Sequence, residues 1–344
     1  MNLLAKVRWQ AVIPLIALLI AALSACGDDK PADTATPTAS PALASSTATQ
    51  PPASAADFDC AAEYRGTEPD ASTFPVEVTD DAKKTLLVAA PPSAIVSLSA
   101  AHTEILYAIG AGDQVVAGDK FSDCPAAAQK LEHLDSFEPN VEAIVALEPD
   151  LVIMSYDPGT VRASLEGADV PVFFVNAPAS VQGVYAQIEQ VGRVTGHLNE
   201  AGALTLGMQL RIDEVVEVAR TVENRPSVFH EVDTSYYSAG PGSFVGDLYD
   251  ILRVPNIANA TGEAFPLMTE EAIIAGNPGV IILADEDAGE SPETVKARAG
   301  WDAIAAVKTN RIYTINPDII SRPGPRLVEA IETLAKFLYP DEFP

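Results

Sequence analysis

The histidines are the first side chains to consider for chemistry, because imidazole acts as a general base and as a metal ligand near neutral pH. No two of them stand at the HxH or HExxH spacing that brings two rings to one metal ion. We therefore predict no metal site, and expect only the first histidine, which begins a helix after a strand, to face a cleft. The four are His102, His133, His197 and His230.

Ser243 is the next candidate, because it stands in the glycine-rich turn 239–244 before a predicted helix. Position 245 is Val, so the GxSxG spacing of a serine hydrolase is absent. The turn also lacks the Gly-Lys-Ser/Thr ending of a nucleotide-binding loop. We predict that Ser243 caps the helix, and we predict no catalytic residue and no cofactor.

Aromatic residues make up only 6% of the chain, and several of them fall in loops at the ends of predicted strands or helices. Flat rings lining a cleft suit a large planar or ring-shaped ligand, which they contact by stacking and by burial of apolar area. The alternative is that half of them, Phe137 and Tyr236 included, belong to the hydrophobic core. The candidates are Phe121, Phe137, Tyr156, Tyr236 and Tyr237.

Arg322 and Arg326 begin the last predicted helix, where the helix dipole disfavours a cation. This position indicates a different role for them. We predict that Arg322 contacts a carboxylate or a ferric chelate in the ligand-binding cleft.

Glu142 and Glu271 occupy matching positions in two similar segments, NVEAIVALEPDLVIM over 140–154 and TEEAIIAGNPGVIIL over 269–283. Each stands in the first turn of a short helix, where the helix dipole alone favours an acidic residue. The functional alternative is that the pair binds arginines on a two-fold symmetric partner.

The two similar segments each read as a short helix, a proline turn and an apolar strand, within a longer alternation of strands and helices. This pattern predicts an α/β fold of two Rossmann-like lobes, each with a mostly parallel sheet. One long helix over 199–223, with apolar residues at steps of three and four, is expected to join them. Asn199 is its expected N-cap, and Pro226 stops its continuation.

The folded part of the chain divides at changes in this pattern. With 48% apolar and 20% charged residues among 344, the composition is that of a globular protein with room for two domains. We expect a leading hairpin segment over 58–92, an N-terminal lobe over 93–197, the connecting helix over 198–224 and a C-terminal lobe over 225–344.

The net charge restricts the partners. Lys and Arg total 21 against 48 for Asp and Glu, a formal charge of −27. Phosphates would be repelled, so we expect no nucleic-acid partner. The charge fits a partner that presents arginine or lysine, or it serves solubility alone.

The first residues resemble a lipoprotein signal. Lys6 and Arg8 precede an apolar run over 11–23, and the sequence Leu-Ser-Ala-Cys follows at 23–26. The resemblance implies that residues 1–25 are removed and that Cys26 is lipidated, which anchors the protein outside the cytoplasmic membrane. From 26 to 57 the sequence is poor in large apolar residues and is expected to be a disordered linker.

Two further cysteines, Cys60 and Cys124, remain in the predicted mature chain. In an exported protein they pair as a disulfide or persist as two buried free thiols, and we expect the disulfide.

The chain from about residue 75 onward resembles the substrate-binding proteins of ABC importers that carry ferric siderophores, haem or vitamin B12. The resemblance implies a ligand held between two lobes joined by a stiff helix, and delivery of that ligand to a permease with its ATPase. It also implies that Glu142 and Glu271 dock onto permease arginines. The matching motifs are IVSLS and TEIL in 95–106, NVEAI and LEPDLV in 140–152, AGPGSF in 239–244, WDAI in 301–304 and RPGPR in 322–326.

We therefore expect an extracytoplasmic binding lipoprotein that captures a corrinoid or a ferric siderophore without altering it. A haem-binding or metal-ion-binding protein of the same fold is one alternative. An extracytoplasmic enzyme that uses His102 in the cleft is a second, and an adhesion or scaffold lipoprotein is a third.

Overall fold

The computed structural model describes residues 58–62, 64 and 66–344, all within one compact unit that spans Gln50–Pro344. The predicted signal peptide, Cys26 and most of the predicted linker lie outside the described residues. No helix in the described part is both long and apolar enough to cross a membrane.

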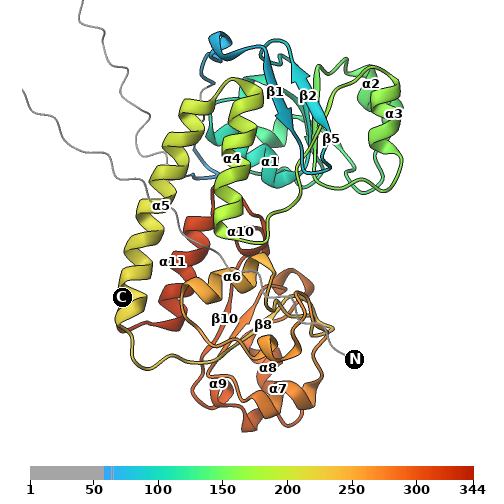
Figure 1. Cartoon of the computed structure of the whole chain (residues 1–344). Helices are drawn as coiled ribbons and strands as arrows, with labels where there is room; N and C mark the ends of the chain where they lie inside the picture. Colours follow the sequence, from blue (N-terminus) through green and yellow to red (C-terminus); the bar gives the residue numbers. More distant parts are fainter. Residues whose placement is uncertain (1–57, 63, 65) are drawn as a thin grey trace, which may run out of the picture. The chain divides into compact units, whose positions relative to one another are not determined.

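The N-terminal lobe is built on a parallel five-stranded sheet in the order β5-β4-β3-β6-β7, with helices packed around it (Figure 1). Buried residues fill every position of β3 and β6, as expected for central strands covered on both faces. The strands are β3 Ile95–Leu98, β4 Val115–Asp119, β5 Glu132–Leu134, β6 Leu151–Met154 and β7 Val172–Phe174. The helices are α1 Ala100–Ala108, α2 Val141–Ala146, α3 Val161–Gly167 and α4 Val181–Thr195.

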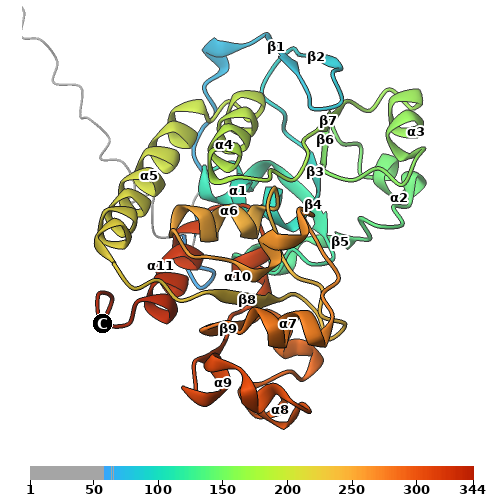
Figure 2. The same ribbon diagram turned by 60° about the horizontal axis from the view of Figure 1, so that its bottom comes forward.

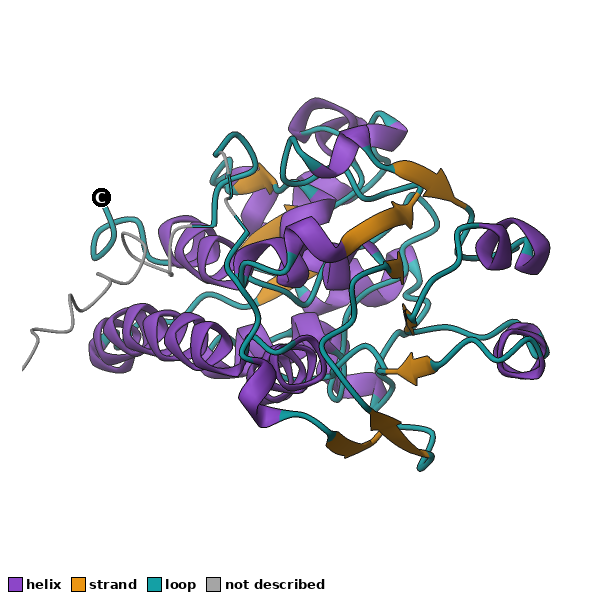
Figure 3. Cartoon of the chain, turned by 90° about the horizontal axis from the view of Figure 1, so that it is seen from above, coloured by secondary structure: helices purple, strands orange, loops and turns teal. Residues whose placement is uncertain are grey.

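The C-terminal lobe has a smaller parallel sheet in the order β10-β9-β8. Figure 3 shows both sets of strands flanked by helices. The strands are β8 Val228–Glu231, β9 Val280–Leu283 and β10 Ile312–Thr314. The helices are α6 Phe244–Ile251, α7 Glu270–Gly276, α8 Pro292–Ala297, α9 Ala305–Lys308, α10 Pro317–Ser321 and α11 Leu327–Leu338.

The similar sequence segments fold alike. In each lobe a capped short helix, α2 or α7, leads into a fully buried strand, β6 or β9. The prediction of two α/β lobes with parallel sheets is confirmed.

The long helix α5 (Leu198–Thr221) joins the lobes. Figures 1 and 2 show α4 beside one part of it and α11 beside another, in agreement with its contacts. Its buried face belongs to a hydrophobic core that continues from the N-terminal lobe into the C-terminal lobe, while each lobe also has a core of its own. A helix packed continuously on both lobes restricts hinge motion between them.

The expected N-cap of α5 is wrong by two residues. The carbonyl of His197 accepts from the Ala201 amide, so the helix already begins at Leu198 and His197 occupies the cap position. Gly196, with φ 84°, ends α4 directly before it. Asn199 therefore lies inside the first turn of α5.

Ser243 has the predicted structural role. Its hydroxyl accepts from the amide of Gly246 at 3.0 Å and caps α6. A Cβ at Gly246 would lie 2.1 Å from the Gly240 carbonyl oxygen, so this turn needs glycine for its packing.

An antiparallel hairpin precedes the first lobe, as the sequence predicts, with β1 (Val76–Thr79) paired to β2 (Thr85–Val88). Asp80 in its turn is buried and accepts from Arg162 of α3 at 2.5 Å, which fixes the hairpin to the lobe. Short 3-10 helices complete the described structure: η1 Ala71–Thr73, η2 Gly112–Gln114, η3 Ala128–Lys130, η4 Ile257–Thr261, η5 Glu286–Ala288 and η6 Trp301–Ala303.

Candidate ligand-binding site

A cavity of about 310 Å³ opens at the carboxyl ends of the N-terminal strands. Parallel strands end at the same edge of a sheet, so the segments that follow β3, β4, β5, β6 and β7 all reach it. The C-terminal part of the chain contributes Asp318, Ser321, Arg322 and Pro323 from α10 and the residues after it. The cavity thus lies where the two parts of the chain meet.

Three aromatic rings line this cavity as a connected row. The ring centroids of Phe121 and Phe137 are 6.1 Å apart, and those of Phe137 and Tyr156 are 6.0 Å apart. Their exposed fractions are 48%, 57% and 51%, which is unusual for large apolar rings and typical of a surface that a ligand covers. The alternative that Phe137 is a core residue is wrong.

Tyr236 and Tyr237 do not line this cavity. Tyr236 is half-buried against Trp301, with ring centroids 5.8 Å apart, and its hydroxyl donates to Glu270 at 2.8 Å. These contacts agree with the interpretation of Tyr236 as a core residue. Tyr237 is exposed and bridges to Leu267, which is also exposed.

Arg322 does line the cavity, but carboxylates of the protein itself already surround its guanidinium group. It donates to Asp123 at 2.6 Å and to Glu104 at 3.2 Å, and it pairs with Asp318 at 2.6 Å. The carboxylates that contact Arg322 thus belong to the chain itself, and its contact with a ligand stays a prediction. Burial disfavours the charge of Asp123, but the hydrogen bond and the charge of Arg322 outweigh it and lower the pKa of Asp123.

Glu104 of α1 and Arg326, which precedes α11, form the buried part of the same network. Arg326 donates to both carboxylate oxygens of Glu104, at 3.0 Å and 2.5 Å, and both side chains are more than nine-tenths buried. Burial raises the pKa of Glu104, and the guanidinium groups of Arg326 and Arg322 oppose that shift. Glu104 was not predicted as a site residue, although an acidic residue inside an apolar helix is a recognisable signal.

His102 faces the cavity, as expected, but in a neutral form. Its side chain is almost fully buried, and burial lowers its pKa to about 4, with a contact to Gln187 opposing the shift in part. Among the described residues, no group of three or more histidines, cysteines or acids is arranged to hold a metal ion.

The remaining histidines make structural contacts. His230 is buried, its pKa is lowered by burial to about 4, and it lies 2.7 Å from the Tyr249 hydroxyl. His197 lies 3.0 Å from the Thr67 carbonyl oxygen, and His133 lies 3.0 Å from that of Asp119.

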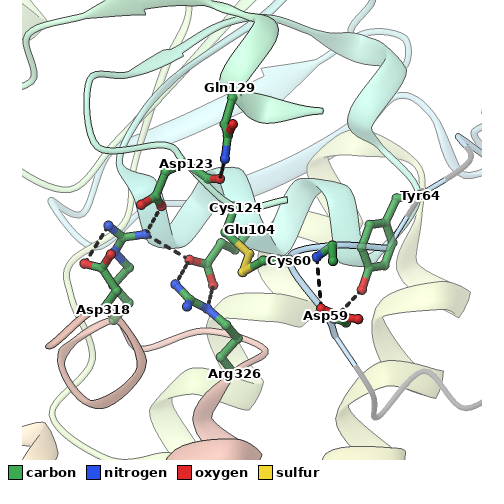
Figure 4. Close-up of a disulfide and its surroundings, with 11 residues drawn as sticks. Asp59, Cys60, Tyr64, Glu104, Asp123, Cys124, Gln129, Asp318 and Arg326 are labelled. Atoms are coloured by element: carbon green, nitrogen blue, oxygen red, sulfur yellow. Dashed lines mark hydrogen bonds and ion pairs between the residues drawn. A yellow bond between two sulfur atoms is a disulfide. The ribbon is translucent and has the colours of Figure 1, made fainter. Parts of the chain in front are cut away.

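Cys60 and Cys124 form a disulfide in the structure, with their sulfur atoms 2.07 Å apart. Figure 4 shows the disulfide between Asp123 and the segment around Asp59. Because Asp123 directly precedes Cys124, the disulfide restrains the loop that brings Asp123 to Arg322. The start of the described chain is thereby attached to the loop that carries Asp123, whose partner Arg322 lines the cavity.

Glu142 and Glu271 lie away from the cavity, each exposed in the first turn of its helix. The side chains of Asn140 and Thr269 cap these helices by accepting from the amides of Ala143 and Ala272. Within the described residues neither glutamate forms an ion pair with another side chain, so both carboxylates are available to a partner.

Two α/β lobes joined by one long helix, with an aromatic-lined cavity at the ends of the strands, are the architecture of a two-lobed binding protein. Residues 95–319 match the family described as "Periplasmic binding protein". This chain belongs to that family, as a substrate-binding protein of the ABC-importer type.

Relatives and solved structures agree with this assignment. The chain is 35% identical over 279 residues to the "Uncharacterized ABC transporter substrate-binding lipoprotein YvrC" of Bacillus subtilis, a match that covers 78% of this chain and 87% of the relative. It is 30% identical over 307 residues to a "Cobalamin-binding protein" of Halobacterium salinarum, covering 86% and 79%. These are binding proteins and not enzymes, as predicted.

The fold also matches a solved structure from Staphylococcus epidermidis, described as a possible iron-binding (periplasmic solute-binding) protein. The TM-score is 0.65 at 28% identity, and the match covers 72% of this chain and 99% of that structure.

Proposed function

We propose that the chain is the lipid-anchored, extracytoplasmic binding component of an ABC importer. It binds a corrinoid in the cavity formed by the ends of the N-terminal strands and the residues around Arg322, and it passes the ligand unaltered to a permease with its ATPase. The row of exposed rings formed by Phe121, Phe137 and Tyr156 carries the proposal.

The row of rings supports a large ligand with an apolar surface. Three neighbouring rings, each about half exposed, bury apolar area when a flat macrocycle covers them. Burial of one such ring contributes about 1.5–3 kcal/mol. The relative from Halobacterium salinarum, matched over most of this chain, is named as a cobalamin-binding protein.

The anchor is supported by the sequence alone. Residues 1–25 have a positively charged start and an apolar run, and they end before Cys26. The relative from Bacillus subtilis is named as a lipoprotein. Mass spectrometry of the protein from membranes tests this part, since lipidation adds acyl chains to Cys26, whereas a peptide with an unmodified Cys26 contradicts it.

The ligand is tested by calorimetric titration with cyanocobalamin, a ferric hydroxamate siderophore and haemin. We expect cyanocobalamin to bind in a one-to-one complex and to be recovered unchanged. Phe137→Ala should weaken binding by at least about tenfold, as loss of one buried ring implies. Leu87→Ala is the matched control, because Leu87 is 63% exposed and lies on the hairpin strand β2.

Two results would contradict the proposal. Tighter binding of the ferric siderophore than of cyanocobalamin would assign the cavity to that second ligand class. Equal affinities of the wild-type protein and Phe137→Ala would place the ligand elsewhere on the protein.

A further inference from the structure

We infer that Asp123 and Asp318 determine specificity, because they neutralise Arg322 and so make the cavity select against anionic ligands. The inference rests on the proposed binding of a corrinoid and adds the charge class of the ligand. Neutral macrocycles with amide side chains are accepted, and ligands that present carboxylates are refused.

Arg322 is the only lysine or arginine among the described residues that line the cavity. An anionic ligand in the cavity would therefore bind at this guanidinium group. Asp123 and Asp318 each lie 2.6 Å from one of its terminal nitrogens, so they hold the positions that a ligand carboxylate would take.

Glu104 does not displace the two aspartates from Arg322. Both of its oxygens accept from Arg326, at 2.5 Å and 3.0 Å, and its contact with Arg322 is longer, at 3.2 Å. Three acidic side chains thus face two guanidinium groups, so the network holds no cation in excess of its acids.

No other described cation at the cavity supplies the unpaired positive charge that Arg322 lacks. Lys120 lies near the aromatic row, 5.2 Å from the ring centroid of Phe121, but it pairs with Asp135 at 2.7 Å. His102 is held neutral by burial. Asp119 adds a further buried carboxyl group to the cavity wall.

The cavity therefore presents an excess of negative charge beside its apolar rings. A ligand carboxylate, such as a haem propionate, would have to approach Asp318 and Asp119 without a free cation to bind it. A neutral amide of a corrinoid meets no such repulsion. Charge of this kind acts by excluding wrong ligands more than by holding the right one.

The test compares neutral and anionic forms of one macrocycle. The probes are cyanocobalamin and its monocarboxylic acid derivatives, in which one amide has been hydrolysed, with haemin as a second anionic ligand. Their affinities are measured for the wild-type protein and for Asp123→Asn/Asp318→Asn, which keeps side-chain shape and removes two negative charges. Both aspartates are partly exposed, at 56% and 36%, so we expect the variant to fold, and thermal unfolding verifies this.

We expect the variant to bind the anionic ligands at least about tenfold more tightly than the wild type, and cyanocobalamin within about threefold. Asp213→Asn is the matched control, because it removes an exposed carboxylate on α5 that does not line the cavity. It should leave the preference for neutral ligands unchanged.

The outcomes separate the two ideas. A wild-type protein that binds no corrinoid overturns the proposed function and this inference together. A wild-type protein that binds cyanocobalamin, combined with an unchanged ratio of neutral to anionic affinity in the double variant, overturns the inference alone.

Discussion

Arg326 donates two hydrogen bonds to Glu104 across 222 residues of sequence. Glu104 belongs to the first helix of the N-terminal lobe, and Arg326 directly precedes the last helix of the chain. The pair is almost free of solvent, so it joins two distant segments next to the ligand cavity.

Glu104→Gln should destabilise the protein more than any exposed charge change. The substitution keeps the shape but leaves Arg326 as a buried cation without its counter-ion, a loss of about 3 kcal/mol. Urea unfolding of the purified protein measures this. Glu332→Gln is the control, because Glu332 pairs with Arg211 at a site where both side chains are about one-third exposed, and it should cost less than about 1 kcal/mol. Equal losses would show that the buried pair contributes no more than an exposed one.

The disulfide should contribute substantially to stability, because Cys60 and Cys124 are 64 residues apart. Closing a loop of that length in the unfolded chain stabilises the folded state by about 4 kcal/mol in the chain-entropy description. We expect reduction, or Cys60→Ser/Cys124→Ser, to lower the melting temperature. Titration of the native protein with a thiol reagent should find both cysteines unreactive, and two reactive thiols would refute the pairing.

Asp285 gives the protein a pH-dependent stability of unusual sign. Burial, together with the negative charges of Glu231 and Glu290, raises its pKa from 3.8 to about 7. The folded state therefore keeps a proton between pH 3.8 and 7 that the unfolded state loses. The contribution of Asp285 is complete below pH 3.8 and is lost as the pH rises towards 7.

Asp285→Asn removes this dependence, because the amide stays neutral over the pH range in which the buried carboxyl group of Asp285 titrates. We compare the free energies of unfolding of the variant and the wild type at each pH. The difference in favour of the variant should be larger at pH 8 than at pH 5, by about 2 kcal/mol. Urea unfolding at both pH values measures the gain. Asp287→Asn, at an exposed position nearby, should show no such difference, and a gain at Asp285 that is the same at both pH values would contradict the raised pKa.

The lobes and the long helix could be predicted because their signals are local. The apolar steps of α5 and the matched segments at 140–154 and 269–283 depend on spacing alone. Strand β5 escaped prediction because it has three residues and only Leu134 is buried. The N-cap at Asn199 was wrong because the end of α4 at Gly196 leaves no room for a longer connection.

The candidate site could be predicted only in part. Phe121, Phe137 and Tyr156 were predicted to line a cleft from loops at the ends of strands or helices, and the three rings do line one cavity. Asp123 was missed because its partner Arg322 lies 199 residues away. The ion pairs that neutralise Arg322 form only in the tertiary structure, so the spacing of residues in the sequence does not reveal them.

Glu142 and Glu271 lead to the last prediction, which concerns the permease. Both carboxylates are exposed at the starts of matched helices and lie outside the cavity. Glu142→Arg/Glu271→Arg places two cations where the proposed partner presents arginines, and like charges in a docking surface oppose association. We expect uptake in cells to fall by at least about tenfold, while affinity for the ligand stays within about twofold.

Glu293→Arg is the matched control for this charge reversal, because Glu293 is also an exposed acid in a first helical turn but has no counterpart in the other lobe. It should leave uptake unchanged. Uptake assays of cells that produce each variant, together with titrations of the purified proteins, distinguish the possibilities. If the double reversal lowers ligand affinity as strongly as uptake, the glutamates support the cavity and do not dock. If the Glu293 variant transports as poorly as the double variant, net charge alone accounts for the loss, and the matched positions of the two glutamates have no special role in docking.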